Sequence, residues 1–198
     1  MRKILTLLLL VPSLAFAEAA PDAMIKDLAN EVTTIIKQEK SRHSDKKALA
    51  QAVDAKIMPH FDFVRMTKLA VGRGWRSATP EQQKNLTQEF HTLLMNTYSS
   101  ALESYQNEPI EVLPLTSPPE SNQVMVHSRI VQAGKEPIAI DYRMEKTSRG
   151  WMIFDVAVEG VSLVTNYRST FQTEISNAGI DGLIKMLADK NKKLETKQ

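Results

Sequence analysis

The chain has 198 residues, with 25 Lys and Arg against 23 Asp and Glu, and it has no cysteine. This length is enough for one domain with a substantial hydrophobic core, and without cysteine no disulfide can hold the fold. A charge so close to balance argues against nucleic acid as a partner, because binding phosphates needs a clustered basic surface.

The first 17 residues have the pattern of a secretory signal peptide. A basic start, Arg2-Lys3, precedes an apolar run from Ile4 to Val11 that is too short to span a bilayer. Ala15-Phe16-Ala17 then has the spacing of a signal-peptidase site. We therefore expect cleavage after Ala17 and an exported, soluble single domain over residues 18–198, with 23 basic and 23 acidic residues.

The next part of the chain has the periodicity of helices. Apolar residues recur at steps of three and four over residues 25–35 and again over 49–57, which predicts two amphipathic helices. A polar break from Ser41 to Ser44 separates them, and Pro59 ends the second. A third, short helix is expected over residues 61–71.

A Gly-Arg-Gly sequence at residues 72–74 ends the third helix, and a strong helix start follows. Thr79 stands before Pro80 and three residues before Gln82, which is the pattern of a capping box with proline at the first helical position. A long helix is predicted from here to about residue 106. Its apolar residues are expected along one side, and they are Leu86, Phe90, Leu94, Tyr98, Leu102 and Tyr105.

After Pro109 the apolar period changes to two, which is typical of strands. Four strands are predicted, over residues 110–115, 124–130, 138–145 and 152–158. Short turns join them, so the sheet is expected to be an antiparallel meander. Two helices, 162–178 and 180–195, finish the chain after a break near Gly179. Helices grouped before and after a run of strands predict an α+β fold.

The last strand sets the expected direction of the side chains. Strict alternation would place Met152, Phe154, Val156 and Val158 on the face that Tyr142 and Met144 share, with Asp155 and Glu159 on the other. On that second face Asp141, Arg143 and Asp155 lie on adjacent strands. We interpret them as a cross-strand charge network, with acid–base catalysis as the alternative.

No motif of an active site is present. None of the four histidines pairs with another at a metal-ligand spacing, and no nucleophile elbow or phosphate-binding loop occurs. We therefore expect no enzymatic activity, no metal and no cofactor. The cationic tail, Lys190 to Lys197, is interpreted as a solvated helix end, with a role at an anionic membrane surface as the alternative.

Three blocks of the chain together resemble the MlaC family. They are FDFVRMTKLAVGRGW at residues 61–75, the segment from Thr79 to Leu102, and DVAVEGVSLVTNYRSTF at residues 155–171. Members of this family are periplasmic phospholipid-binding proteins of the pathway that maintains outer-membrane lipid asymmetry, also described as toluene-tolerance proteins. The resemblance implies a twisted antiparallel sheet wrapped by helices, similar to nuclear transport factor 2 (NTF2-like), with an internal apolar cavity.

The resemblance also implies a function. A phospholipid carrier in the periplasm would hide the acyl chains of its cargo and leave the headgroup in water. Its expected partners are an outer-membrane lipoprotein–porin complex (MlaA-like) and an inner-membrane ABC transporter complex (MlaD-like). The side chains expected to line the lipid pocket are Trp75, Phe90, Leu94, Tyr98, Leu102, Tyr142, Met144, Met152, Phe154, Val156, Val161 and Tyr167.

Two other classes of function stay open at this point. One is a periplasmic adaptor that binds no lipid and only bridges membrane complexes. The other is an enzyme of NTF2-like shape, which would need a buried polar dyad inside the pocket, whereas the alternation predicts the charges on the opposite face.

Overall fold

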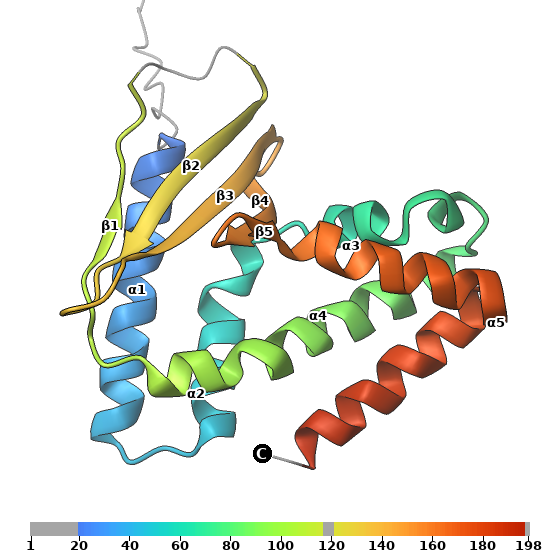
Figure 1. The fold of residues 1–198 in the computed structure, drawn as a ribbon, viewed down its shortest axis with the longest axis horizontal. Coiled ribbons are helices and arrows are strands. Elements are labelled where there is room, and N and C mark those ends of the chain that lie inside the picture. Colours follow the sequence, from blue (N-terminus) through green and yellow to red (C-terminus); the bar gives the residue numbers. More distant parts are fainter. Residues whose placement is uncertain (1–19, 117–120, 197–198) are drawn as a thin grey trace, which may run out of the picture.

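The structure is a computed structural model that describes residues 20–116 and 121–196 (Figure 1). The predicted signal peptide and its cleavage site lie outside the described residues. The elements in chain order are α1 (Pro21–Ser41), α2 (Lys46–Lys56), η1 (Met58–His60), α3 (Phe63–Val71), η2 (Gly72–Arg76), α4 (Pro80–Ser104), β1 (Ile110–Val112), β2 (Gln123–Ile130), β3 (Ile138–Thr147), β4 (Gly150–Val158), β5 (Val161–Ser162) and α5 (Leu163–Glu195). The α+β class predicted from the sequence is confirmed.

Local signals in the sequence explain where the long helices begin and bend. The capping box is formed: Gln82 N–H donates to Thr79 Oγ1 over 3.2 Å, and Thr79 N–H donates to Gln82 Oε1 over 2.9 Å. In α5 the predicted break is confirmed at Gly179, whose φ of 71° lies in the left-handed region that glycine tolerates. Figure 1 shows the second half of α5 turning back alongside α4.

The third helix begins later than predicted. Asp62 is the N-cap residue of α3, because its Oδ1 accepts from Arg65 N–H over 2.9 Å. The residue before it, Phe61, is extended and forms a parallel bridge with Ile153 of β4, and Asp62 N–H donates to the carbonyl oxygen of Ile153 over 2.8 Å. This bridge ties the start of α3 to the sheet.

The sheet has five strands in the order β1-β2-β3-β4-β5, each antiparallel to its neighbour. The predicted meander is therefore confirmed. One irregularity lies between β3 and β4: Arg143 lies opposite Asp155 and Met144 lies opposite Ile153, so Phe154 is an extra residue in β4. This is a β-bulge, and it reverses the alternation of side chains along β4.

The bulge makes the expected alternation of β4 wrong. Ile153 lies opposite Met144 and Val156 lies opposite Tyr142, so Ile153 and Val156 share one face although they are three residues apart. Met144, Trp151, Ile153 and Val156 belong to one buried cluster, and Met152 and Phe154 do not. Met152 and Phe154 are instead buried on the other side of the strand, at 4% and 2% exposure.

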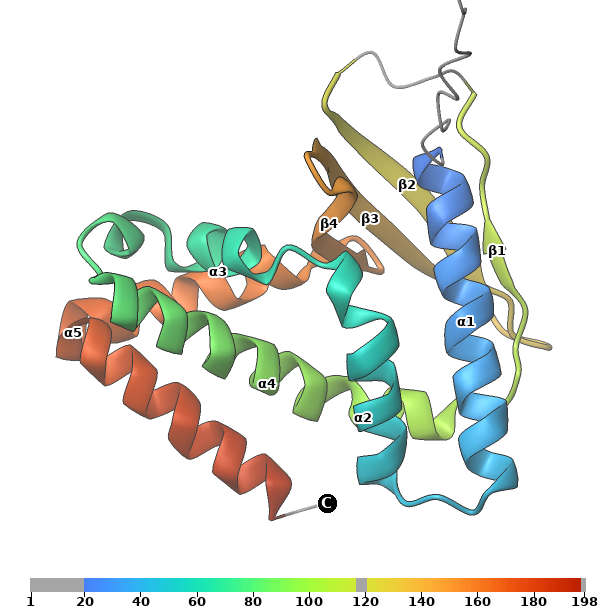
Figure 2. The ribbon, with the colours of Figure 1, turned by 180° about the vertical axis from the view of Figure 1, so that it is seen from behind.

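Two hydrophobic cores hold the fold. The sheet core joins the sheet to α1 and α2, and its buried residues are Ile25, Leu28, Ile35, Ile36, Leu49, Val53, Ile57, Val126, Met144, Trp151, Ile153 and Val156. The helical core joins α3, η2, α4 and α5, and its buried residues are Met66, Ala70, Val71, Trp75, Leu86, Phe90, Leu93, Leu94, Val164, Phe171, Leu183 and Leu187. Figure 2 shows the sheet and α1 at one side of the molecule, and α3, α4 and α5 at the other.

Helix α4 contributes to both cores, which corrects the single stripe predicted for it. Leu86, Phe90 and Leu93 are buried in the helical core, whereas Met95 and Leu102 pack against the sheet core. Among the described residues, no helix has the length and apolar character needed to cross a membrane.

Candidate functional site

The two cores meet along a line of partly buried apolar side chains. Phe61 and Leu163 pack against both cores at once, and neither is fully covered by protein. Five further partly buried side chains pack against one core or the other, namely Met95, Tyr98 and Leu102 of α4, Tyr142 of β3 and Tyr167 of α5. We call the set the seam, and its residues are Phe61, Met95, Tyr98, Leu102, Tyr142, Leu163 and Tyr167.

The seam is uncharged at neutral pH. Burial raises the pKa of Tyr98, and the nearby phenol of Tyr167 raises it further. Burial also raises the pKa of Tyr142, although a hydrogen bond with Ser128 opposes that change. Tyr98 and Tyr142 therefore stay protonated, and the remaining seam side chains are aliphatic or aromatic. Such a lining is suited to an apolar ligand.

Packed aromatic rings form one wall of the seam. The ring of Phe90 meets Tyr167 and Phe171 edge-on, with centroids 5.3 and 5.2 Å apart. Edge-to-face rings of this kind add stability beyond their buried area. The ammonium of Lys190 lies 5.6 Å from the centroid of Tyr167, at the outer side of the same wall.

The structure brings only some of the predicted pocket residues to the seam. Tyr98, Leu102, Tyr142 and Tyr167 lie there. The other eight lie elsewhere: Trp75, Phe90 and Leu94 are buried in the helical core, Met144 and Val156 in the sheet core, Met152 and Phe154 on the opposite face of β4, and Val161 is 57% exposed at the β4–β5 turn.

Three seam residues were missing from the sequence-based set, namely Phe61, Met95 and Leu163. Met95, Tyr98 and Leu102 follow one another at steps of three and four along α4, which is the signal that could have shown a second stripe on this helix. Phe61 had no such signal, because its position depends on the bridge to Ile153.

A second apolar region, a pocket of about 660 Å³, lies between α2, η1, α3, η2 and α4. It borders the seam through Phe63, whose ring stacks on that of Phe61 with centroids 5.9 Å apart. Its size is within the range of small-ligand sites. On one side His91 Nε2 lies 2.7 Å from Asp54 Oδ1, and Phe63 meets the imidazole edge-on at 4.4 Å. The residues lining this α3–α4 pocket are Asp54, Met58, Pro59, Phe63, Val64, Trp75, Pro80, Gln83, Lys84, Thr87, Gln88 and His91, so Trp75 is the one predicted residue among them.

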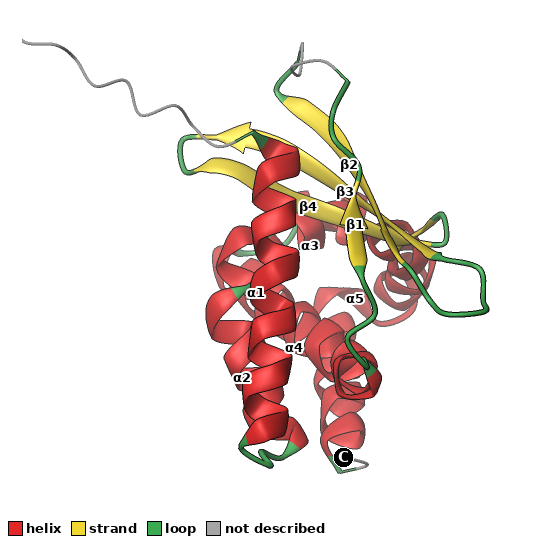
Figure 3. Ribbon diagram, turned by 90° about the vertical axis from the view of Figure 1, so that its left-hand side faces the viewer, coloured by secondary structure: helices red, strands yellow, loops and turns green. Residues whose placement is uncertain are grey.

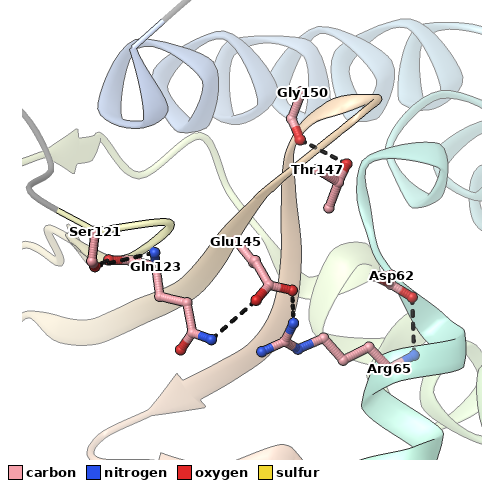
Figure 4. Close-up of polar contacts among 7 residues, drawn as sticks. All are labelled: Asp62, Arg65, Ser121, Gln123, Glu145, Thr147 and Gly150. Atoms are coloured by element: carbon pink, nitrogen blue, oxygen red, sulfur yellow. Dashed lines mark hydrogen bonds and ion pairs between the residues drawn. The ribbon is translucent and has the colours of Figure 1, made fainter.

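The face of the sheet opposite α1 carries charged side chains whose contacts are largely structural. Figure 4 shows Glu145 between Arg65, with which it forms an ion pair, and Gln123, whose Nε2 donates to Glu145 Oε1 over 3.0 Å. The guanidinium of Arg65 lies 4.0 Å from the centroid of the Phe154 ring. The pKa of Arg65 is lowered, mainly because the guanidinium is partly buried. These contacts join α3 to the sheet.

The predicted charge network on this face is confirmed for one cross-strand pair, since Arg143 Nη1 lies 3.8 Å from Asp155 Oδ2. The third predicted member, Asp141, instead contacts His127, a residue outside the predicted network, with Oδ1 2.7 Å from Nδ1. Asp155 is only 1% exposed, and besides its pairing with Arg143 it forms hydrogen bonds at the start of α5.

The carboxylate of Asp155 accepts from Ser162 Oγ over 2.6 Å and from Val164 N–H over 3.2 Å, at the start of α5. A carboxylate in this position satisfies a free N–H group and favours the positive end of the helix dipole. Asp155 therefore anchors α5 to β4, and no carboxylate lies among the seam residues. The described residues also contain no group of three His, Asp or Glu arranged to hold a metal ion.

An α+β domain whose two cores meet at an uncharged apolar seam has a lining suited to an apolar ligand. The model of the MlaC protein family matches residues 26–189, which is most of the chain. The chain belongs to the MlaC family.

Relatives with known names support this assignment. The intermembrane phospholipid transport system binding protein MlaC of Haemophilus influenzae is 25% identical over 179 residues, which cover 88% of this chain and 84% of the relative. The toluene tolerance protein ttg2D of Pseudomonas putida is 25% identical over 182 residues, covering 91% and 84%.

A solved structure has the same fold. It is a phospholipid-binding protein from Ralstonia solanacearum, determined in complex with a phospholipid. It is 35% identical, with a TM-score of 0.83, and the match covers 89% of this chain and 99% of that one.

Proposed function

We propose that this chain binds a phospholipid through its acyl chains and carries it across the periplasm. The observation that carries this proposal is the similarity to the Ralstonia solanacearum protein, whose structure contains a phospholipid. At 35% identity and with nearly full coverage of both chains, the two proteins share a fold in which the same ligand class can be accommodated.

The physical need for such a carrier is large. Each CH₂ group removed from water is worth about 0.8 kcal/mol, so two acyl chains of ordinary length represent on the order of 20 kcal/mol. Free phospholipid therefore does not cross an aqueous compartment at a useful rate. A protein that covers the acyl chains removes most of this barrier.

We place the acyl chains along the seam. Its side chains are apolar or protonated phenols, and they are only partly covered by the protein itself. The bound lipid would bury the remaining exposed area of these residues, which is the source of its affinity. The headgroup would stay in water, where it loses no hydration, so we expect low headgroup selectivity.

Exchange with membrane-bound partners is the second half of the proposal. The name of the relative from Haemophilus influenzae, an intermembrane phospholipid transport system binding protein, supports a transport pathway. The partners we propose are an MlaA-like lipoprotein–porin complex in the outer membrane and an MlaD-like ABC transporter complex in the inner membrane. The signal-peptide pattern of residues 1–17 supports a periplasmic location.

We propose that the protein acts without catalysis. An enzyme of this shape would need a buried polar dyad in its pocket. The His91–Asp54 pair of the α3–α4 pocket has side chains that are 27% and 45% exposed, and the buried carboxylate of Asp155 is held at the start of α5 by Ser162 and Val164. In this proposal the phospholipid is cargo, and it leaves the protein chemically unaltered.

Mass spectrometry of the purified protein tests the proposal. The full precursor is expressed with its own signal sequence, and the mature protein is purified without detergent, denatured in organic solvent and extracted. We expect about one equivalent of phospholipid in the extract. Folded protein that reproducibly yields no phospholipid would contradict the carrier function and favour an adaptor that binds no lipid.

A further inference from the structure

Cations gather at one end of the molecule although the chain as a whole is nearly balanced. Residues 37–47 contain five Lys and Arg against two Asp and Glu, and residues 185–195 contain four against two. The first segment spans the end of α1 and the start of α2, and the second is the end of α5. Figures 1, 2 and 3 all show these segments at the same end of the molecule. We call them together the basic end.

About half of these cations have acidic or carbonyl partners. Arg42 pairs with Glu39 at 2.8 Å, Lys46 with Glu103 at 3.6 Å, and Lys185 with Asp189 at 2.9 Å. Lys40 Nζ donates to the carbonyl oxygen of Tyr105. The Arg42 and Lys185 pairs lie within one helix end or turn, whereas Lys40 and Lys46 join α1 and α2 to the end of α4.

Other lysines of the basic end are exposed and form no ion pair within the described residues. They are Lys37, Lys47, Lys192 and Lys193, and Lys190 contacts only the ring of Tyr167. Lys192 and Lys193 act on Asp189 at longer range and contribute to lowering its pKa, after the larger effect of Lys185. The basic end thus keeps a positive field that its own carboxylates do not cancel.

The basic end borders the seam. Lys46 Nζ donates to Ser100 Oγ over 2.9 Å, so α2 contacts the last turns of α4, the same turns that carry Tyr98 and Leu102. Lys190 lies over the ring of Tyr167, another seam residue. A surface bound to these lysines would therefore lie beside the proposed lipid site.

We propose that the basic end docks on the surface of an anionic phospholipid membrane and presents the seam to the bilayer. This inference rests on the proposed carrier function. The lysines come from three helices and are single, exposed ammonium groups on flexible stems. Such groups suit a diffuse negative surface better than a fixed set of carboxylates on a protein partner.

The expected affinity follows from the number of free lysines. One Lys near an anionic surface strengthens binding roughly fivefold, so three to five of them give on the order of a hundredfold or more at low salt. The attraction acts over about 10 Å at an ionic strength of 0.1 M and is weaker at higher salt.

Vesicle flotation with the full mature chain tests this inference. One set of vesicles contains phosphatidylcholine alone, and a second also contains phosphatidylglycerol. We expect the protein to float with the second set at low salt and to be released by high salt. The triple variant Lys190→Gln, Lys192→Gln, Lys193→Gln should bind at least tenfold more weakly, and Lys37→Gln with Lys47→Gln provides a second variant on different helices.

The matched control is Lys68→Gln, Arg73→Gln, Arg76→Gln, which removes three cations near the other end of α4. Since α4 has 25 residues, its two ends are about 37 Å apart. This control should bind vesicles like the parent protein.

Two results would overturn the docking surface. One is that the protein does not float with anionic vesicles, which is expected if the basic end instead binds an acidic protein. The other is that the control and both lysine variants float equally well. The solvent extract of every variant is also analysed for phospholipid, which tests the carrier function independently of docking. If the carrier function were wrong, all the extracts would lack phospholipid.

Discussion

Leu102→Asp is the sharpest test of where the acyl chains bind. Leu102 lies on the last part of α4, is partly buried, and packs against the edge of the sheet core. Because Leu102 is a seam residue, this position contributes to the fold and, in our proposal, to the lipid contact. The substitution places a carboxylate where hydrocarbon would lie.

The expected effects on folding and on lipid binding differ in size. Fully burying a leucine side chain is worth about 1.5–3 kcal/mol, so the loss of partly buried Leu102 should lower the free energy of unfolding by about 2 kcal/mol. In the lipid-free protein the new carboxylate can reach water. Bound lipid would remove that water, and leaving a charge unsolvated costs several kcal/mol. Every 1.4 kcal/mol is about tenfold in affinity, so lipid occupancy should fall by about a hundredfold or more.

The assay measures both quantities on the same protein. Phospholipid is quantified by mass spectrometry of the solvent extract, and the melting temperature is measured after delipidation. For a domain of this size about 2 kcal/mol corresponds to a decrease of roughly 4–8 °C. The control is Val64→Asp, which adds the same charge at a side chain that is 57% exposed and lines the α3–α4 pocket.

The pair of variants also shows which result would refute the reasoning. We expect the Leu102 variant to lose its lipid and the Val64 variant to keep it. A folded Leu102 variant with a full complement of phospholipid would mean that the seam is not the binding site. Loss of lipid from the Val64 variant alone would assign the acyl chains to the α3–α4 pocket.

Three further predictions concern the framework around the seam. Asp155→Ala removes the acceptor for Ser162 Oγ and Val164 N–H, so it should lower the free energy of unfolding by about 3 kcal/mol. Urea titration measures this change, and an unchanged urea midpoint would show that Asp155 does not anchor α5. Gly74→Ala places a Cβ 2.9 Å from Ile175 Cδ1, and because this atom ends a flexible side chain the overpacking should destabilise by only about 1 kcal/mol. A melting temperature equal to that of the parent protein would contradict the tight packing of η2 on α5. Burial in the folded protein raises the pKa of Tyr142 above its ordinary value of 10.0, so folding favours the neutral phenol. The stability that Tyr142 contributes is therefore complete below pH 10 and is lost as the pH rises through the folded-state pKa. Chemical denaturation from pH 8 to 11.5 should show this loss for the parent protein and a smaller slope for Tyr142→Phe.

Much of the fold follows from local sequence signals. The capping box at Thr79, the glycine break at Gly179 and the short turns between strands act within a few residues of the chain, so the sequence contains what is needed to predict them. The meander follows from the same reasoning, because short turns leave consecutive strands no other way to pair.

The direction of the side chains in β4 could not be predicted in this way. Trp151 to Val156 is apolar at five of six positions, so either phase of the alternation gives a buried face. The bulge at Phe154 depends on which residues of β3 lie opposite, and a shift by one residue moves side chains to the other face. For this reason Met152 and Phe154 were assigned to the wrong side of the sheet.

The sequence alone indicates an α+β domain of the MlaC family, with its main helices and four of its five strands in their order. Only the tertiary structure decides that α4 serves two cores, that Asp155 is buried at the start of α5, and that Phe61, Leu102 and Tyr167 lie along one seam. The physical reason is that local propensity acts over a few residues, whereas the seam forms between segments that are far apart in the chain. Which side chains stay partly uncovered there depends on how the two cores pack.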